Sequence, residues 1–330
     1  MTETELKFQV PPERRHALHQ AVATSTAVTT RLQAVYADTN DRRLAAAGLA
    51  LRLRQEGPHW VQTLKGRGDG LLQRLEHELP LGAQADIPTL DARRHAGTPV
   101  GNRLLALLAD GTALQPIYRT DIHRLHRRVQ HGGAVIELAY DRGRILAGAH
   151  KTRVDEIEFE LIRGPRAALL SLAGRWAQRH SLWWDVRTKS ELGYRLALGL
   201  HTVAAVPALR LRLPATCAAA RAFGPLLLRV LAQCMPNAAE IASGSGGLAH
   251  RNALRQGLAQ LARVLMAAAA SADEPDAVLT LAADWQALAA KALRDEADDI
   301  EAAAAVRGQI FNRLMLHTLG TAMAMAAATA

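Results

Sequence analysis

The sequence predicts an α+β protein, in which an antiparallel, closed or nearly closed β-barrel is followed by an all-helical part. Up to about residue 205, charged and apolar residues alternate in short runs separated by glycines. Beyond it, Ala, Leu and Arg recur with helical spacing and the alternation disappears. Gly132-Gly133 and Asp141-Arg142-Gly143 are typical of hairpin turns, so neighbouring strands should be antiparallel. Many antiparallel strands with few helices favour a barrel.

Nine runs with strand-type alternation make up the predicted barrel. They cover residues 3–10, 31–38, 48–56, 59–65, 72–79, 117–130, 133–141, 144–149 and 153–162. Helices are expected at 12–22, 98–109 and 165–180. The first is predicted because Pro11-Pro12 followed by Glu13 is typical of a helix start.

The second part of the chain predicts a set of helices. They are expected at 216–235, 248–270, 273–292 and 296–325. The Ser- and Gly-rich segment 243–247 is predicted to be a loop, and Pro275 marks a helix start. Pro207 and Pro214 lie in a segment that connects the two parts of the chain, so we expect two domains, 1–204 and 205–330.

Composition narrows the class of protein. A chain of 330 residues with 49% hydrophobic content can bury two cores. Of the formal net charge of +9, roughly +8 lies before residue 205, which favours a polyanionic partner, although compositional drift explains the charge equally well. We expect no membrane span, no signal peptide and a cytoplasmic location. Cys217 and Cys234 are expected to be small buried thiols.

Charged residues at every second position are the most informative pattern. In an extended strand, Glu3, Glu5 and Lys7 project from one face. A solvated face explains one such strand, but three carboxylates in a row, as at Glu156, Glu158 and Glu160, repel each other unless something binds them. We therefore expect these faces to turn inward. Carboxylates are ligands for Mg²⁺ or Mn²⁺, whereas arginine and lysine bind phosphate oxygens.

The order of these runs resembles the CYTH superfamily of triphosphate tunnel metalloenzymes, and in particular its bacterial inorganic triphosphatases. The similarity covers roughly residues 1–200. It is carried by Glu3-x-Glu5-x-Lys7, Arg52-x-Arg54, Lys65, Arg74-Leu75-Glu76-x-Glu78, Arg124, Asp141, Glu156-Ile157-Glu158 and Lys189-Ser190-Glu191-Leu192-Gly193-Tyr194-Arg195. The resemblance implies an eight-stranded antiparallel tunnel with charge on its inner wall.

The resemblance also implies roles for individual residues, with Mg²⁺ or Mn²⁺ as cofactor. The implied metal ligands are Glu3, Glu5, Glu156 and Glu158, assisted by Glu76 or Glu78, with Asp141 completing the acidic lining. The implied triphosphate-binding residues are Lys7, Arg52, Arg54, Lys65, Arg74, Arg124 and Lys189. Glu3, Glu5 and Lys7 are the expected catalytic residues, and Arg74 has pairing with the carboxylates as an alternative role. Tyr36 is expected to be a packing residue, and His77 to face away from the site.

The helical part resembles a short, degenerate CHAD domain, a helical domain that binds polyphosphate. Arg251, Leu254 and Arg255 fit the family's first basic helix, but Leu248 stands where its histidine is expected. Loss of polyphosphate binding, with a packing or dimerisation role, is as well supported as retained binding.

The leading functional hypothesis is metal-dependent hydrolysis of inorganic triphosphate or another polyphosphate. Hydrolysis of thiamine triphosphate or of nucleotides is an alternative, although only 4% of residues are aromatic. A non-catalytic polyphosphate- or nucleotide-binding module is the alternative of a different class. Nucleic acid and membrane are not expected as partners.

Overall fold

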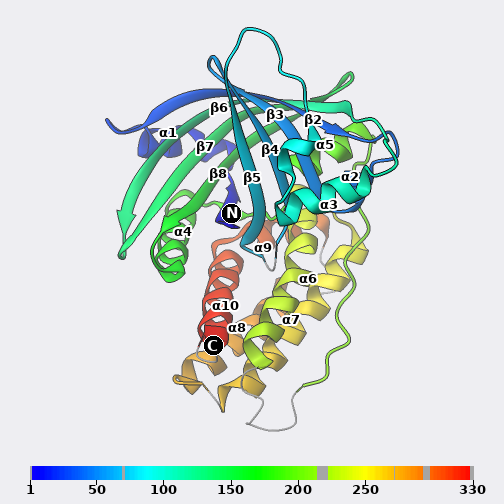
Figure 1. Cartoon of the computed structure of the whole chain (residues 1–330). Helices are drawn as coiled ribbons and strands as arrows, with labels where there is room; N and C mark the ends of the chain where they lie inside the picture. The colour runs from blue at the N-terminus through cyan, green and yellow to red at the C-terminus, as the bar shows by residue number, and fades with distance from the viewer. Residues whose placement is uncertain (1, 69–70, 214–221, 271, 293–297, 328–330) are drawn as a thin grey trace. The chain divides into compact units, whose positions relative to one another are not determined.

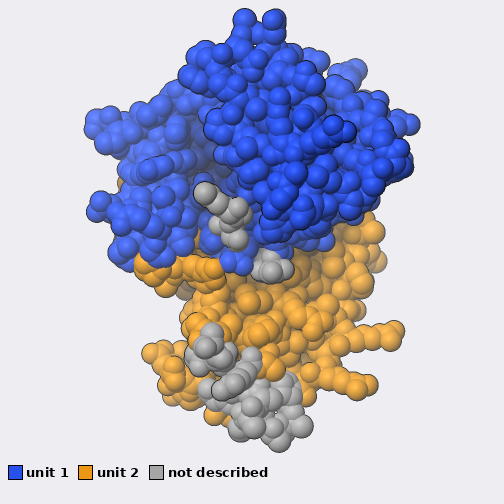
Figure 2. Space-filling model, in the orientation of Figure 1, with its two compact units in different colours: residues 1–7, 15–164, 187–201 blue, residues 8–14, 165–186, 202–330 orange. Residues whose placement is uncertain are grey.

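The computed structural model describes residues 2–68, 71–213, 222–270, 272–292 and 298–327. The chain divides into two compact units. Residues 1–7, 15–164 and 187–201 form the barrel unit, and residues 8–14, 165–186 and 202–330 form the helical unit. Figure 1 shows the elements, and Figure 2 colours the barrel unit blue and the helical unit orange.

Eight strands close into a ring, which confirms the predicted eight-stranded barrel. The strands are β1 (Thr2–Gln9), β2 (Val28–Asp38), β3 (Leu49–Glu56), β4 (His59–Arg67), β5 (Gln73–Ala83), β6 (Gln115–His131), β7 (Ala134–Ala147) and β8 (His150–Arg163). They are hydrogen-bonded in the order β5-β4-β3-β2-β6-β7-β8-β1, and β1 returns to pair with β5. Glu3 lies opposite Arg74 in that closing pair, which is antiparallel.

One predicted turn was wrong. Asp141-Arg142-Gly143 lies inside the continuous strand β7, where Asp141 pairs with Arg124 on one side and with Glu156 on the other. Gly143 marks a close approach of strands, because a Cβ there would lie 2.0 Å from the backbone oxygen of Asp121. The Gly132-Gly133 hairpin is confirmed, and both glycines have positive φ values, of 52° and 75°.

The two faces of the barrel strands differ as the alternation predicts. On β3 and β4, Leu49, Leu51 and Leu64 are buried against α2 (Arg43–Ala46) and α3 (Pro99–Leu107), which cover the outer face. Arg52 and Arg54 alternate with those leucines and therefore face the interior. The barrel unit also contains α1 (Arg15–Val22). The 3-10 turn Pro12–Arg14 belongs to the helical unit, and Ala92–His95 forms another in the barrel unit.

A short helix that the sequence did not predict packs on the barrel's tyrosines. Helix α5 (Lys189–Ala197) begins after Thr188, whose hydroxyl accepts the Glu191 backbone N–H. Its Tyr194 joins Tyr36 and Tyr118 in one buried cluster. Gly193 allows the close approach, because a Cβ there would lie 2.2 Å from the Tyr118 ring. This helix brings Lys189 to the charged interior.

The helical unit follows the prediction in most elements. It contains α4 (Arg166–His180), β9 (Trp183–Trp184), α6 (Phe223–Ser243), α7 (Leu248–Ala269), α8 (Pro275–Ala292), α9 (Asp299–Arg307) and α10 (Gln309–Ala327). Helix α6 continues through Pro236 beyond its expected end. The last predicted helix is two helices, because the chain is extended at Gly308 and the Asn312 amide donates to the carbonyl oxygens there.

Some expectations for this unit stay predictions. Cys234 is buried, as expected, whereas Cys217 lies outside the described residues. The resemblance to CHAD and the domain boundary at 204/205 are untested. Among the described helices, none has the length and apolar character needed to cross a membrane.

Candidate functional site

The barrel interior holds a network of ion pairs whose members range from buried Lys7 and Glu156 to the 41% exposed Glu78. It contains every residue that the sequence predicted for the site: Glu3, Glu5, Lys7, Arg52, Arg54, Lys65, Arg74, Glu76, Glu78, Arg124, Asp141, Glu156, Glu158 and Lys189. These side chains come from β1, β3–β8 and α5, so residues far apart in sequence line one interior (Figure 1).

The first part of the network joins β1 to β4 and β5. The Lys65 ammonium lies 2.8 Å from the Glu3 carboxylate and 3.1 Å from that of Glu76. Arg74 lies 3.3 Å from Glu5, so it pairs with a carboxylate, which was one of its two expected roles. Two glutamates of the opening motif are thus held by basic residues of neighbouring strands.

The arginine pair of β3 forms the second part. Arg54 donates to the Glu78 carboxylate at 3.2 Å, and Arg52 donates to the Tyr36 hydroxyl at 3.0 Å. The Nε atoms of Arg52 and Arg54 are buried and, among the described residues, have no hydrogen-bond partner. Buried donors without a partner are costly unless a ligand accepts from them. Both arginines therefore have donors available for an anion.

The third part is an acidic triad around the Lys189 ammonium. Ligand oxygens of Asp141, Glu156 and Glu158 all lie within 4.8 Å of one another. Lys189 lies 2.7 Å from Asp141 and 2.8 Å from Glu158, and also pairs with Glu156. Arg124 donates to both oxygens of Asp141 at 2.7 Å and to Glu158 at 2.6 Å.

Lys7 is a further cation that pairs with the acidic triad. Its ammonium, which is 4% exposed, donates to Glu156 at 3.2 Å. The third residue of the opening motif thus reaches the later acidic strand β8, whereas Glu3 and Glu5 reach β4 and β5. The opening motif therefore links the acidic triad to the Lys65 and Arg74 pairs.

Electrostatics keep two carboxylates of the triad, Asp141 and Glu158, ionised. Burial would raise the pKa of Glu158, but Lys189 and Arg124 outweigh it and hold that pKa well below the usual range. The pKa of Asp141 is lowered for the same reasons, with Arg124 acting most strongly against burial. Burial would lower the pKa of Lys189, but the three carboxylates raise it well above its usual value. Asp141 and Glu158 are therefore charged at neutral pH.

Three other carboxylates of the interior, on β5, β8 and β1, behave differently. Burial raises the pKa of Glu76 to about 7, although Lys65 acts against it. Burial together with Glu3 and Glu137 raises the pKa of Glu160 to about 7. Burial also raises the pKa of Glu5, against the effect of Arg74. Bound cations would favour the ionised form of each.

The donor set fits a divalent metal ion. Hard ions such as Mg²⁺ and Mn²⁺ prefer carboxylate oxygens, and the triad offers three within 4.8 Å. Among the described residues, this is the group of three carboxylates that satisfies that spacing. The other implied ligands, Glu3, Glu5, Glu76 and Glu78, line the same interior next to basic side chains.

Two functional features were missed in the sequence. Tyr36 stacks on Tyr118 at a centroid distance of 4.5 Å, as a packing residue should, but its hydroxyl also accepts from Arg52. The register could have indicated this contact, because Tyr36 and Arg52 are direct cross-strand partners. The Thr63 hydroxyl donates to the Glu78 carboxylate at 3.1 Å, a contact that the sequence pattern does not indicate. His77 faces away from this site and lies 2.9 Å from the His95 ring nitrogen.

Part of the chain is similar in sequence to known proteins. The CYTH domain family matches residues 1–183. An inorganic triphosphatase from Haemophilus influenzae is 31% identical over 202 residues, which are 59% of this chain and 55% of that protein. The chain thus spans about half the length of this curated relative.

Part of the chain is also similar to solved structures. HpAC1 from Hippeastrum, for which a dominant triphosphatase activity is described, is 17% identical, with a TM-score of 0.41 over 60% of this chain and 96% of its own. The PH1012 protein from Pyrococcus horikoshii OT3 is 15% identical, with a TM-score of 0.36 over 58% of this chain and 98% of its own.

Proposed function

This chain belongs to the CYTH family, and we propose that its barrel hydrolyses inorganic triphosphate to diphosphate and phosphate with the help of Mg²⁺ or Mn²⁺. The observation that carries the proposal is the composition of the interior. Two half-buried arginines, whose Nε donors have no partner in the described part of the chain, lie in the same barrel as three clustered carboxylates. An enclosed site with both sets suits a complex of metal and polyphosphate. The name of the Haemophilus relative also supports this substrate.

The residues divide the work by charge. Asp141, Glu156 and Glu158 would hold the metal ion, with Glu3, Glu5, Glu76 and Glu78 as further carboxylate ligands. When bound, the ion neutralises phosphate charge and makes water a better nucleophile. Lys7, Arg52, Arg54, Lys65, Arg74, Arg124 and Lys189 would bind phosphate oxygens, so several present ion pairs would be exchanged for contacts with substrate.

The reaction itself needs positioning and charge stabilisation. Water attacks the terminal phosphorus, the bond from that phosphorus to the bridging oxygen breaks, and diphosphate leaves with that oxygen while the water releases a proton. The guanidinium of Arg52, which the Tyr36 hydroxyl orients, would stabilise charge on the transferred group. Exclusion of bulk water strengthens these contacts.

Substrates with an organic group are less well supported. Tyr36, Tyr118 and Tyr194 are the aromatic residues of the buried cluster, and they contact one another: Tyr118 stacks on Tyr36 and meets Tyr194 edge-on. Their ring faces are therefore used in packing. Thiamine triphosphate and nucleotides remain as competing substrates in the test.

Phosphate release from triphosphate, thiamine triphosphate and ATP, with Mg²⁺, with Mn²⁺ or with EDTA, tests the proposal. We expect triphosphate to be the preferred substrate and EDTA to abolish turnover. Glu158→Gln, which removes one charge from the triad, should lower turnover at least tenfold and shift the metal titration. The exposed Glu13 supplies the matched control, Glu13→Gln, which should match wild type. If none of the three substrates is hydrolysed, the chain is a binding module and the proposal fails.

A further inference from the structure

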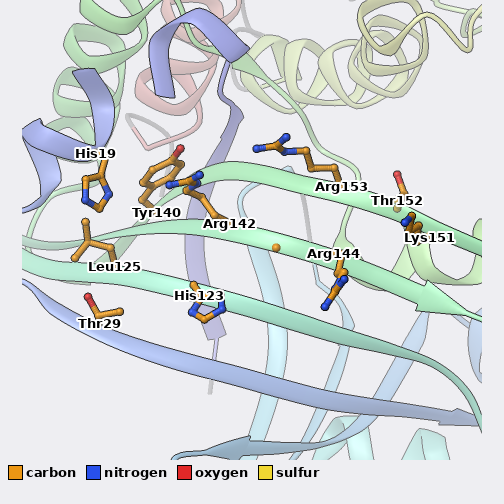
Figure 3. Close-up of a pocket in the computed structure, with 11 residues that line it drawn as sticks. His19, Thr29, His123, Leu125, Tyr140, Arg142, Arg144, Lys151, Thr152 and Arg153 are labelled. Atoms are coloured by element: carbon orange, nitrogen blue, oxygen red, sulfur yellow. The ribbon is translucent and has the colours of Figure 1, made fainter. Parts of the chain in front are cut away.

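A basic groove lies on the outer wall of the barrel. We call it the outer groove; it has a volume of about 760 Å³ and is lined by residues of α1, β2, β6, β7 and β8. Its basic lining residues are His19, His123, Arg142, Arg144, Lys151 and Arg153. Figure 3 shows these side chains around one groove, with the arginines and Lys151 rising from neighbouring strands. The outer groove thus presents cations to solvent.

The outer groove is separate from the charged interior. Asp141 points into the barrel, where it pairs with Arg124, so its neighbour Arg142 points outward. Arg144 and Arg153 are more than half exposed, at 56% and 59%. An anion in the outer groove would therefore bind without entering the tunnel.

Positive charge exceeds negative charge around the outer groove. Among the described residues that form ion pairs there, the acids are Asp121 and Asp155. Asp155 is shared by Arg15 at 2.9 Å, Arg153 at 2.5 Å and Arg142 at 3.9 Å. Asp121 is shared by Arg31 and by Arg144 at 3.6 Å. Lys151 is exposed and has no ion pair within the described part of the chain.

The strand register brings like charges together. Arg144 and Arg153 are direct partners across β7 and β8, whose backbones are about 4.8 Å apart. Arg142 lies two residues before Arg144 on β7, and Lys151 lies two residues before Arg153 on β8, so all four side chains are on the outer face. Four cations therefore share a surface two strands wide. Like charges directly opposite each other destabilise a sheet. An anion that bridges the four would remove this repulsion.

We propose that the outer groove binds inorganic polyphosphate, with phosphate oxygens held by Arg142, Arg144, Lys151 and Arg153. Guanidinium groups match the phosphate geometry, and a chain of closely spaced phosphates can satisfy four neighbouring cations at once. Single-stranded nucleic acid fits less well, because its binding sites combine basic residues with large exposed aromatic rings on which successive bases stack. The one tyrosine in the lining, Tyr140, is 1% exposed and hydrogen-bonds to Asp155.

This binding site goes beyond the proposed hydrolysis, and one experiment separates the two. Binding of a long-chain polyphosphate and of a single-stranded RNA homopolymer is measured on the full chain at several salt concentrations. The test variant is Arg144→Ala/Lys151→Ala. The control is Arg93→Ala/Arg163→Ala, which removes the same charge from exposed positions outside the outer groove. Triphosphate hydrolysis is measured for each protein as a separate readout.

We expect the test variant to bind polyphosphate at least tenfold more weakly than wild type. The slope of log affinity against log salt concentration should fall by about 2, one for each lost phosphate contact. The control should keep wild-type affinity, and triphosphate turnover should be unchanged in both variants. Equal loss in the control, or wild-type affinity in the test variant, would overturn the proposal. Tighter binding of RNA that depends on Arg144 and Lys151 would show that polyphosphate is the wrong occupant.

Discussion

Helix α5 should be very sensitive to one methyl group at Gly193. A Cβ on this residue would lie 2.2 Å from Cε2 and 2.4 Å from Cδ2 of Tyr118. Tyr118 cannot move away freely, because it stacks on Tyr36 at 4.5 Å and its hydroxyl lies 3.0 Å from Ser190 Oγ. The clash must therefore be relieved by a shift of α5.

The size of the effect follows from packing. Inserting a methyl group into a well-packed core costs about 1–3 kcal/mol of unfolding free energy. Alanine is favoured over glycine inside a helix by about 1 kcal/mol, which offsets part of that cost. Gly174→Ala provides a control, because the nearest atom to a Cβ on Gly174, in α4, is 3.6 Å away. Relative to this control, Gly193→Ala should be less stable by about 1–3 kcal/mol.

The displaced helix should also change the site. Lys189 is the first residue of α5 and lies 2.7 Å from Asp141 and 2.8 Å from Glu158. A shift of α5 would lengthen both contacts, so triphosphate hydrolysis should fall in Gly193→Ala and stay unchanged in Gly174→Ala. Urea unfolding and phosphate release measure the two effects. Equal stability of the two variants would refute the packing argument.

Three further predictions concern hydrogen bonding, pH and charge. Tyr36→Phe keeps the ring but removes the acceptor for Arg52, so the KM for triphosphate should rise about tenfold, and the loss of this hydrogen bond should lower the free energy of unfolding by about 1–3 kcal/mol; an unchanged KM would contradict an orienting role. Burial lowers the pKa of His95 to about 4, and the nearby His77 acts in the same direction. As the pH falls, His95 is therefore protonated in the unfolded state before it is protonated in the folded state. The unfolding free energy should therefore drop as the pH falls from about 6.5 to 4, and it should drop less steeply in His95→Asn. Urea unfolding across that pH range measures this free energy. The control is His16→Asn, which removes an exposed histidine. Lys189→Met leaves three carboxylates without their shared cation and should lower the free energy of unfolding by about 3–5 kcal/mol. Because Mg²⁺ can take the place of that cation, it should restore part of this stability. Thermal unfolding with and without Mg²⁺ measures the effect, and a variant that Mg²⁺ does not stabilise would contradict the prediction.

Charged residues at alternate positions predicted the inner wall of the barrel, because the side chains of a strand follow a simple geometric rule. A strand turns successive side chains to opposite faces, so Arg52 and Arg54 point one way and Leu51 the other. The inward position of Asp141 was implied by the resemblance to the CYTH superfamily, because the sequence pattern had assigned this residue to a turn. The geometric rule could not show that β7 continues through Gly143, because a glycine indicates a turn and a close strand approach equally well. The wrong turn followed from that ambiguity.

The content of the site was more predictable than its pairing. Charged residues at alternate positions of a strand identify a charged wall. The pairing of each carboxylate with its cation depends on the order of the strands in the barrel and on elements outside the alternating strands. Lys189 illustrates this, because it enters the interior from α5, a helix that the alternation does not encode. Its ammonium lies among the three carboxylates that best fit a divalent ion. A metal ion and Lys189 would therefore share the same oxygens, and binding of one must change the contacts of the other.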